Sequence, residues 1–493
     1  MMSNRPWAAH GQVSTPMEPT RKNATAPKIN MSIHVDNHYQ SKIYTTASSV
    51  SGHVKVNAPR DTSLDEVRIL FLGTGRTQVD TVNIPVATSH VFLKLTMPIP
   101  DSFYPEARDF EAGATYSFPF HFIIPQHLTL NACTHCDINA SLREDHLRLP
   151  PSLGDWDKED FTPDMTRIRY YLRASTYQED GSGKCHKVAE ATHDIKVIPL
   201  VAEAAPLNIT KQDKLYVMTR SKALRRSILS SKLGSVTASA NQPAPVMIGS
   251  DGYSVTPTTA QIDLVFEPTT IESQPPKITG VTSKVTAVTY YSSSHVCQYP
   301  NLKDWYGPFG SEGRGSYSSS VSLPTTRVES APWMQYLTPQ GKRDSGYASQ
   351  SHSDSDRSQG CRQPLEKQSQ KGAPYYYATK VQVSIQLPAA RRQFIPTFHA
   401  CIASRVYVLW MAVTLSVPTG KSSTITLGVP LQIGVGSRAG AQVGATGPPS
   451  FEAAVEDASF EVDTYLRPRT LSVPDIEFCS VLPGYSTINN RRA

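Results

Sequence analysis

Residues 113–125 read GATYSFPFHFIIP. Large apolar side chains occupy every second position of this run, at Tyr116, Phe118, Phe120, Phe122 and Ile124. Because successive side chains of a β-strand point to opposite faces, these five groups form one continuous apolar face. We therefore predict a strand whose apolar face is covered by a second sheet.

Pro119 lies on the opposite face of the same predicted strand. Proline has no backbone N–H to donate to a neighbouring strand, so within sheets it is restricted to particular positions. An edge strand, a bulge and a break in pairing are the three alternatives that the sequence leaves open for Pro119.

Short runs of strand character recur on both sides of this stretch, between turn residues and without helical periodicity. In the first region they cover residues 33–35, 43–56, 67–72, 91–95, 116–124, 168–176 and 188–197. In the second they cover residues 261–266, 277–291, 375–387, 400–417 and 423–435. This spacing predicts an all-β protein with two β-sandwich domains in tandem and no βαβ unit.

The length of 493 residues exceeds what one ordinary core supports, while the charged (18%) and hydrophobic (39%) fractions are both low. Part of the chain is therefore expected to be unfolded. We predict a disordered tail over 1–29, a first sandwich over 30–203, a basic connector over 204–243, a second sandwich over 244–437 with a disordered insertion at about 292–374, and a C-terminal tail over 438–493.

The apolar run over residues 406–413 is shorter than the ~20 residues that a membrane-spanning helix needs. Residues 1–25 are polar and do not resemble a signal peptide. Seven cysteines without framework spacing are typical of reduced thiols, so no structural disulfide is predicted. These features predict a soluble, cytoplasmic protein.

The whole net positive charge of the chain can be assigned to the connector. Residues 211–233 contain seven basic residues and one acid, Asp213, so their local excess of six equals the net charge of the whole chain, +6. The basic residues are Lys211, Lys214, Arg220, Lys222, Arg225, Arg226 and Lys232. A short amphipathic helix on an anionic membrane surface and a solvated linker are both compatible with this pattern. Nucleic acid is not expected as a partner, because the remainder is near neutral and has no base-stacking motif.

Cys133 and Cys136 have the spacing of half a zinc site, which needs two further ligands. His146 and the adjacent Cys185 and His186 are the nearby candidates, and they do not form a second spaced pair. We therefore predict no metal and no cofactor. The chain also has no zinc-protease histidine pair and no nucleophile elbow, so no catalytic residues and no enzyme activity are predicted.

Two proline motifs lie in the predicted C-terminal tail. PPSF covers residues 448–451 and LPGY covers 482–485, so each differs by one residue from the Pro-Pro-x-Tyr ligand of WW domains. The candidate ligand residues are Pro448, Pro449, Phe451, Leu482, Pro483 and Tyr485. In the predicted insertion, residues 344–349 read DSGYAS, which matches the pattern D-S-G-x-x-S of phosphorylation-dependent degrons. Ser345 and Ser349 are therefore candidates for phosphorylation.

The run over residues 113–125 resembles a strand of the arrestin N-terminal domain, which commonly reads G-x-x-Y-x-F-P-F-x-F-x-I-P. Residues 44–46, 50–52, 67–73, 92–98 and 146–154 (HLRLPPSLG) are similar to segments of fungal arrestin-related proteins. Residues 394–398 (FIPTF), 404–409 (SRVYVL) and 429–433 (VPLQI) resemble closing strands of an arrestin C-terminal domain.

This resemblance to the α-arrestins implies two immunoglobulin-like sandwiches and an adaptor function in protein transport. Such adaptors bind membrane transporters or receptors and recruit a WW-domain HECT ubiquitin ligase, so that the cargo is ubiquitylated and taken up by endocytosis. They associate transiently with the plasma membrane or endosomes. Phe451 departs from the ligase-binding motif, which leaves a scaffold for endosomal sorting or signalling without a ligase as an alternative. A metal enzyme or hydrolase on a β-sandwich is the alternative from another class.

Overall fold

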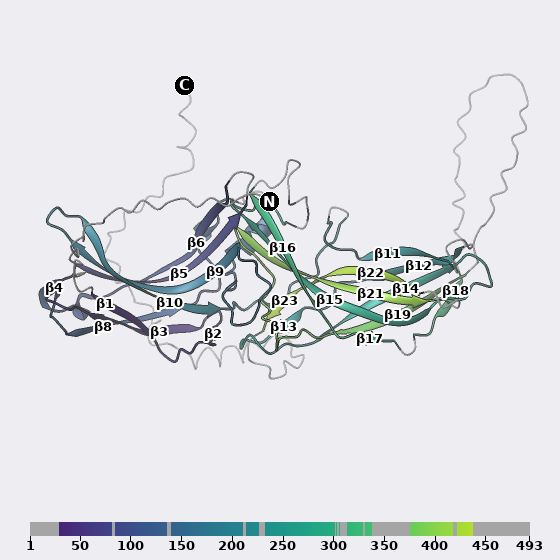
Figure 1. Cartoon of the computed structure of the whole chain (residues 1–493), viewed down its shortest axis with the longest axis horizontal. Coiled ribbons are helices and arrows are strands. Elements are labelled where there is room, and N and C mark those ends of the chain that lie inside the picture. Colours follow the sequence, from purple (N-terminus) through teal and green to yellow (C-terminus); the bar gives the residue numbers. More distant parts are fainter. Residues whose placement is uncertain are drawn as a thin grey trace, which may run out of the picture. The chain divides into compact units, whose positions relative to one another are not determined.

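The computed structural model describes residues 29–80, 84–135, 140–210, 213–225, 232–300, 302, 305, 313–328, 331–337, 375–417 and 422–436. All of them belong to one compact unit, Met1–Arg438. Strands dominate the described residues, so the protein is all-β as predicted, and these strands form two pairs of sheets (Figure 1).

The first sheet pair encloses its own apolar core. Its three-stranded sheet has the order β1 (Asn30–Val35), β3 (Ser49–Asn57), β8 (Thr115–Ile123). Its five-stranded sheet has the order β2 (Ile43–Tyr44), β10 (Cys185–Val197), β9 (Thr166–Glu179), β5 (Glu66–Val79), β6 (Val86–Met97). A small sheet of β4 (Thr62–Ser63) and β7 (Asp109–Phe110), three 3-10 turns (Asp101–Phe103, Glu106–Arg108, Leu130–Ala132) and one helix, α1 (Ala140–Leu147), complete this part.

Strand β8 carries the aromatic face predicted from the sequence. Phe118, Phe120 and Phe122 are buried while the residues between them are exposed. The Phe122 ring lies 5.9 Å from the ring of Phe71 in the opposite sheet, so the aromatic face is covered by a second sheet as predicted. Because β8 pairs with β3 alone, Pro119 lies in an edge strand, the first of its three alternatives.

Gly52 of β3 shows how closely this sheet is packed. A Cβ atom at this position would lie 2.0 Å from the backbone oxygen of His34 and 2.8 Å from the ring of Phe120. Gly52 is opposite Phe120 in the β3–β8 register, so its missing side chain makes room for the aromatic ring.

The second sheet pair has a five-stranded and a six-stranded sheet. The first has the order β11 (Thr219–Arg225), β12 (Lys232–Ala240), β14 (Thr258–Pro268), β19 (Tyr375–Ile385), β18 (Met334–Leu337). The second has the order β16 (Arg314–Ser322), β15 (Lys277–Ser292), β21 (Ala403–Ser416), β20 (Phe398–His399), with β17 (Thr326–Arg327) on β15 and β22 (Ser422–Leu431) on β21. Strands β13 (Val246–Ile248) and β23 (Ile433–Val435) pair in parallel.

Two segments that were predicted to have no strands contain strands in the structure. The connector over 204–243 contains the antiparallel strands β11 and β12, which form one side of the second sheet pair, and no helix is present in its described residues. The insertion over 292–374 contains β16, β17 and β18, whose pairing with β15 and β19 satisfies backbone groups despite their polar sequence. Residues 338–374 lie outside the described part.

No helix among the described residues is long and apolar enough to cross a membrane.

A pair of histidines in the first sheet pair predicts a loss of stability in acid. The rings of His38 and His193 meet edge to face at 4.7 Å, and His38 is hydrogen-bonded to the Tyr44 hydroxyl at 3.2 Å. Burial lowers the pKa of both imidazoles; His193 and Lys42 lower that of His38 further, while Asp194 opposes the shift at His193 and His34 adds to it. Both rings are therefore neutral in the folded chain at neutral pH.

We expect the free energy of unfolding to fall as the pH is lowered through about 6.5, the pKa of an unfolded histidine. The unfolded chain then binds protons that the folded chain excludes until the pH reaches the lowered pKa values. Urea unfolding at pH 7.5 and 5.5 measures this change. The double variant His38→Gln, His193→Gln should show a smaller difference between the two pH values, and an unchanged difference would contradict the assignment.

Candidate functional site

Arg405 of β21 joins the two sheet pairs through hydrogen bonds inside the protein. Its side chain is fully buried, and its Nε donates to Thr289 Oγ1 of the neighbouring β15 at 2.8 Å. Across the junction, its Nη1 donates to the backbone oxygen of Asp160 at 2.8 Å, and its Nη2 donates to the backbone oxygen of Phe161 at 3.2 Å and to Thr162 Oγ1 at 3.0 Å. One planar guanidinium thus holds a loop of the first sheet pair against a strand of the second.

The loop that contains Phe161 is inserted into the second sheet pair and does not only contact its surface. The backbone of Phe161 has a φ of 60°, a conformation that is costly for a bulky residue unless its surroundings stabilise it. The side chain is buried in the core of the second sheet pair, with its ring 5.3 Å from that of Phe394. In the opposite direction, Ile395 and Phe398 pack into the core of the first sheet pair.

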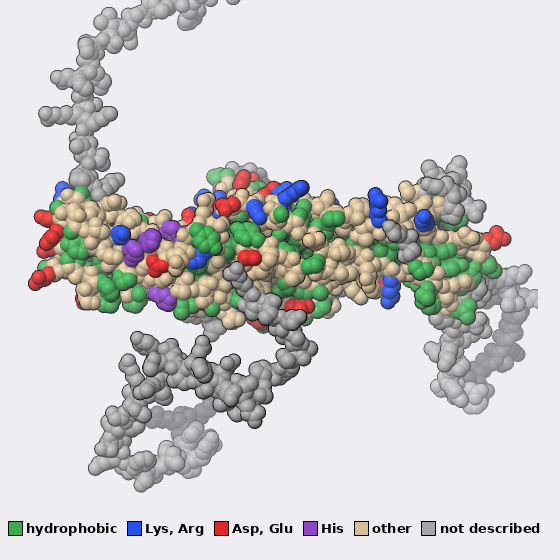
Figure 2. All heavy atoms as spheres, turned by 90° about the horizontal axis from the view of Figure 1, so that it is seen from below, with side chains coloured by type: hydrophobic (Ala, Val, Ile, Leu, Met, Phe, Trp, Pro, Cys, Tyr) green, Lys and Arg blue, Asp and Glu red, His purple; other side chains and the backbone are tan. Residues whose placement is uncertain are grey.

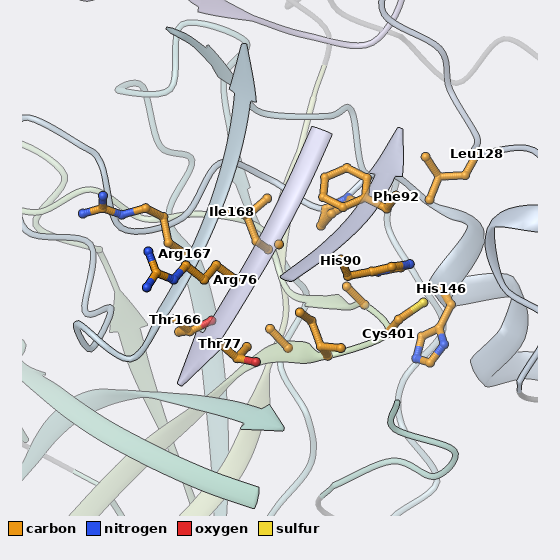
Figure 3. A pocket seen from close by; sticks show the side chains of 15 residues that line it. Arg76, Thr77, His90, Phe92, Leu128, His146, Thr166, Arg167, Ile168 and Cys401 are labelled. Atoms are coloured by element: carbon orange, nitrogen blue, oxygen red, sulfur yellow. The ribbon is translucent and has the colours of Figure 1, made fainter. Parts of the chain in front are cut away.

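A second contact of the junction gathers two thiols and two imidazoles. The ligand atoms of Cys133, His135, His146 and Cys401 all lie within 4.8 Å of one another. Cys133 Sγ is 3.5 Å from His146 Nδ1 and 3.7 Å from His135 Nε2. Cys133, His146 and Cys401 are at most 3% exposed, whereas His135 is half-buried. Figure 3 shows Cys401 and His146 beside His90 at one side of a small pocket.

Three local elements position these side chains, since His135 lies in the same segment as Cys133. Cys133 follows the turn Leu130–Ala132, and His146 lies in the last turn of α1. Cys401 lies in the tight turn between β20 and β21, where the N–H of Val296 donates to its backbone oxygen at 2.8 Å. The turn is closed by the N–H of Ala400, which donates to the backbone oxygen of Ala403 at 2.8 Å.

Further histidines surround this group. The His295 ring stacks on His135 at 4.1 Å and meets His90 edge to face at 5.5 Å. Burial, reinforced by the neighbouring imidazoles beginning with His135, lowers the pKa of His146 to about 3. Burial also lowers the pKa of His399 to about 4. The buried rings are thus neutral at physiological pH, the state in which imidazole binds metals.

From the sequence no metal is predicted, because no second pair of ligands lies near Cys133 along the chain. The structure supplies His146, which the sequence had named, and Cys401, which comes from the other sheet pair. Cys401 is so far from the other ligands along the chain that no spacing motif in the sequence indicates it. Cys185 and His186 lie at the start of β10 and do not belong to the group, and Cys136 lies outside the described residues.

The basic residues predicted to contact membranes fall into four sets. Lys211 and Arg226 lie outside the described residues, and Lys214 is exposed in the segment before β11. Arg220 and Lys222 share a face of β11 with the buried Leu224, and the Lys222 ammonium donates to the backbone oxygen of Thr424 at 3.0 Å. Arg225 is the backbone partner of Lys232 on β12, next to a register shift, so two basic residues are paired at this end of β11. On the face in Figure 2, Lys and Arg side chains are scattered rather than joined in one large patch.

The remaining predicted site residues lie outside the described part of the chain: Pro448, Pro449, Phe451, Leu482, Pro483, Tyr485, Ser345 and Ser349.

A groove of about 510 Å³ at the junction was not foreseen from the sequence. Pro150 and Pro151 of the first sheet pair line it together with Tyr407 and Pro430 of the second, and residues 204–205 and 207–209 contribute as well. Its volume lies within the range of about 300–1,000 Å³ that is typical of ligand sites. Short Ala- and Pro-containing segments carry no periodic signal that would have marked this groove.

Comparison of the chain with protein-family models and with curated proteins finds no match. The site geometry and the sequence motifs are therefore the basis of the functional proposal.

Proposed function

We propose that this protein is an arrestin-like adaptor that binds membrane transporters or receptors and promotes their ubiquitin-dependent endocytosis. The observation that carries the proposal is the junction at Arg405, where two sheet pairs with separate cores are held together by a buried guanidinium and an inserted loop. Such a junction supports two tandem immunoglobulin-like sandwiches of the arrestin type that act as one binding surface. The groove beside it offers room for a segment of cargo.

In this proposal the protein acts by binding and has no catalytic activity. It works in the cytoplasm and associates transiently with the plasma membrane or endosomes. The paired basic residues Arg225 and Lys232 at one end of β11 support contact with an anionic membrane surface, which attracts clustered basic side chains. The tail motifs around Phe451 and Tyr485 would recruit the WW-domain HECT ubiquitin ligase.

Crosslinking in cells tests the proposal, with the full chain compared to a chain truncated after Gly447. We expect the full chain to capture both a membrane transporter or receptor and a WW-domain ligase, and the truncated chain to capture the cargo alone. The variant Phe451→Ala, Tyr485→Ala should lose the ligase in the same way. The matched variant Phe460→Ala, Tyr465→Ala removes two other tail aromatics and should retain it. Capture of no membrane protein by any of these chains would refute the adaptor function.

An arrestin-fold scaffold for endosomal sorting or signalling without a ligase is the second candidate. It is favoured by the motifs themselves, since Phe451 lacks the tyrosine hydroxyl and Leu482 replaces a proline. In the crosslinking experiment, cargo capture that is insensitive to the Phe451 and Tyr485 changes, together with no ligase on the full chain, identifies this function.

A further inference from the structure

We propose that Cys133, His135, His146 and Cys401 bind one Zn²⁺ ion that fastens α1 and the turn before it to the second sheet pair. The proposal concerns a site that the adaptor function does not use, and it stands or falls separately from that function.

The distances fit a four-coordinate ion. With Zn–S bonds of about 2.3 Å and Zn–N bonds of about 2.0–2.1 Å, the ligand atoms of a tetrahedron lie roughly 3.3–3.8 Å apart. Cys133 Sγ lies 3.5 Å from His146 Nδ1 and 3.7 Å from His135 Nε2, and the whole set is contained within 4.8 Å. Rotations of these side chains would bring the wider pairs of ligand atoms toward the spacing of a tetrahedron.

The ligand types select the metal. Two thiolates and two imidazoles in a tetrahedral arrangement suit zinc, whereas calcium and magnesium require oxygen ligands. Four protein ligands fill the coordination shell, and three of them are buried, so no position is left for a water molecule or a substrate. The geometry is that of a structural zinc site rather than a catalytic one.

Helix α1 gives an independent reason for a metal at this place. It has eight residues, of which Leu142 and His146 alone are buried, and it is the sole α-helix among the described residues. Helices this short are marginal without tertiary contacts. Leu142 packs in a small cluster with Cys133, Cys401 and Ile402, separate from both main cores. A zinc ion in this cluster would supply the stabilisation that its few apolar contacts do not.

The site also connects elements of the two sheet pairs. Cys133, His135 and His146 belong to the first sheet pair, and Cys401 belongs to a turn of the second. That turn is fixed by the bonds from Val296 and Ala400 described above, and the Cys297 thiol donates to the backbone oxygen of His135 at 3.2 Å. These hydrogen bonds hold the backbone of Cys401 and of His135 in place without an ion, as further contacts do around the ligands of a metal site.

Zinc content of the full chain tests the proposal. The chain is purified without a histidine tag from cells supplied with zinc, desalted, and measured by elemental mass spectrometry together with a thiol count under denaturing conditions. We expect about one zinc per chain, and less than a tenth of that for Cys401→Ser and for His135→Asn. Because His135 is half-buried, His135→Asn should remain folded even if the buried Cys401→Ser does not. Circular dichroism of each variant checks this.

Cys185→Ser is the matched control, because it removes an exposed thiol outside the group and should leave the zinc content unchanged. Cobalt in place of zinc should give the absorption of tetrahedral thiolate coordination in wild type and not in His135→Asn. The proposal is overturned if the folded wild-type chain retains no zinc, or if peptide mapping shows a disulfide between Cys133 and Cys401. It is also overturned if Cys136→Ser loses the zinc while Cys401→Ser retains it.

Discussion

Replacement of Arg405 by methionine should lower the free energy of unfolding by about 3–5 kcal/mol. Methionine fills much of the same volume but donates no hydrogen bond, so the backbone oxygens of Asp160 and Phe161 and the Thr289 hydroxyl lose a buried donor. The strained backbone of Phe161 loses the partner that holds it in place. Urea unfolding followed by circular dichroism and tryptophan fluorescence measures the change.

The two sheet pairs should also become less coupled in this variant. We expect the urea transition to become less steep, because Arg405 bonds residues 160–162 of one pair to a strand of the other and its loss weakens the cooperativity between them. Arg405→Lys keeps the charge and loses the planar fork, so its stability should be intermediate. Arg327→Met, at an exposed position of β17, should change stability by less than about 0.5 kcal/mol. A similar effect of Arg327→Met and Arg405→Met would contradict this role for Arg405.

Replacement of Phe118 by alanine should cost about 3–5 kcal/mol. Phe118 is fully buried in β8, with its ring 5.4 Å from Tyr104 and 6.3 Å from Phe110. Truncation leaves a cavity that this close-packed layer of rings cannot fill. The thermal midpoint and the urea midpoint should both fall, while the secondary structure below the midpoint stays that of wild type.

Ser117→Ala is the control for Phe118→Ala, since Ser117 is the adjacent, exposed residue of the same strand. It should have little effect on either midpoint. An equal loss of stability in the two variants would contradict the prediction that the aromatic face of residues 113–125 stabilises the first sheet pair.

The sequence predicted strands best where one face is apolar. The alternation in β8 marked its buried face, and Pro119 narrowed its place in the sheet to three options, of which the edge is observed. Strand β11 was missed because its single buried residue, Leu224, stands among basic and polar residues whose charge suggested a linker. Its strand conformation comes from pairing with β12, which a local pattern does not reveal.

The candidate metal site was predictable in part. The spacing of Cys133 and Cys136 indicated the segment after the turn Leu130–Ala132, and His146 is among the ligands that the sequence suggests. Helix α1 has no clear apolar face to mark it, and Cys401 is brought in by the packing of one sheet pair on the other. Arg405 likewise looked like one more residue of a strand, because its partners at 160–162 lie in a loop of the other half.

The exchange of side chains across the junction limits how the chain can be divided. A fragment that ends near residue 203 would expose Phe161 to water and leave holes where Ile395 and Phe398 pack. The complementary fragment would lack Phe161 in its own core and would expose those two residues. Neither half therefore has a complete core of its own. Cleaving the chain between the two sheet pairs would leave both fragments without some of their packing contacts.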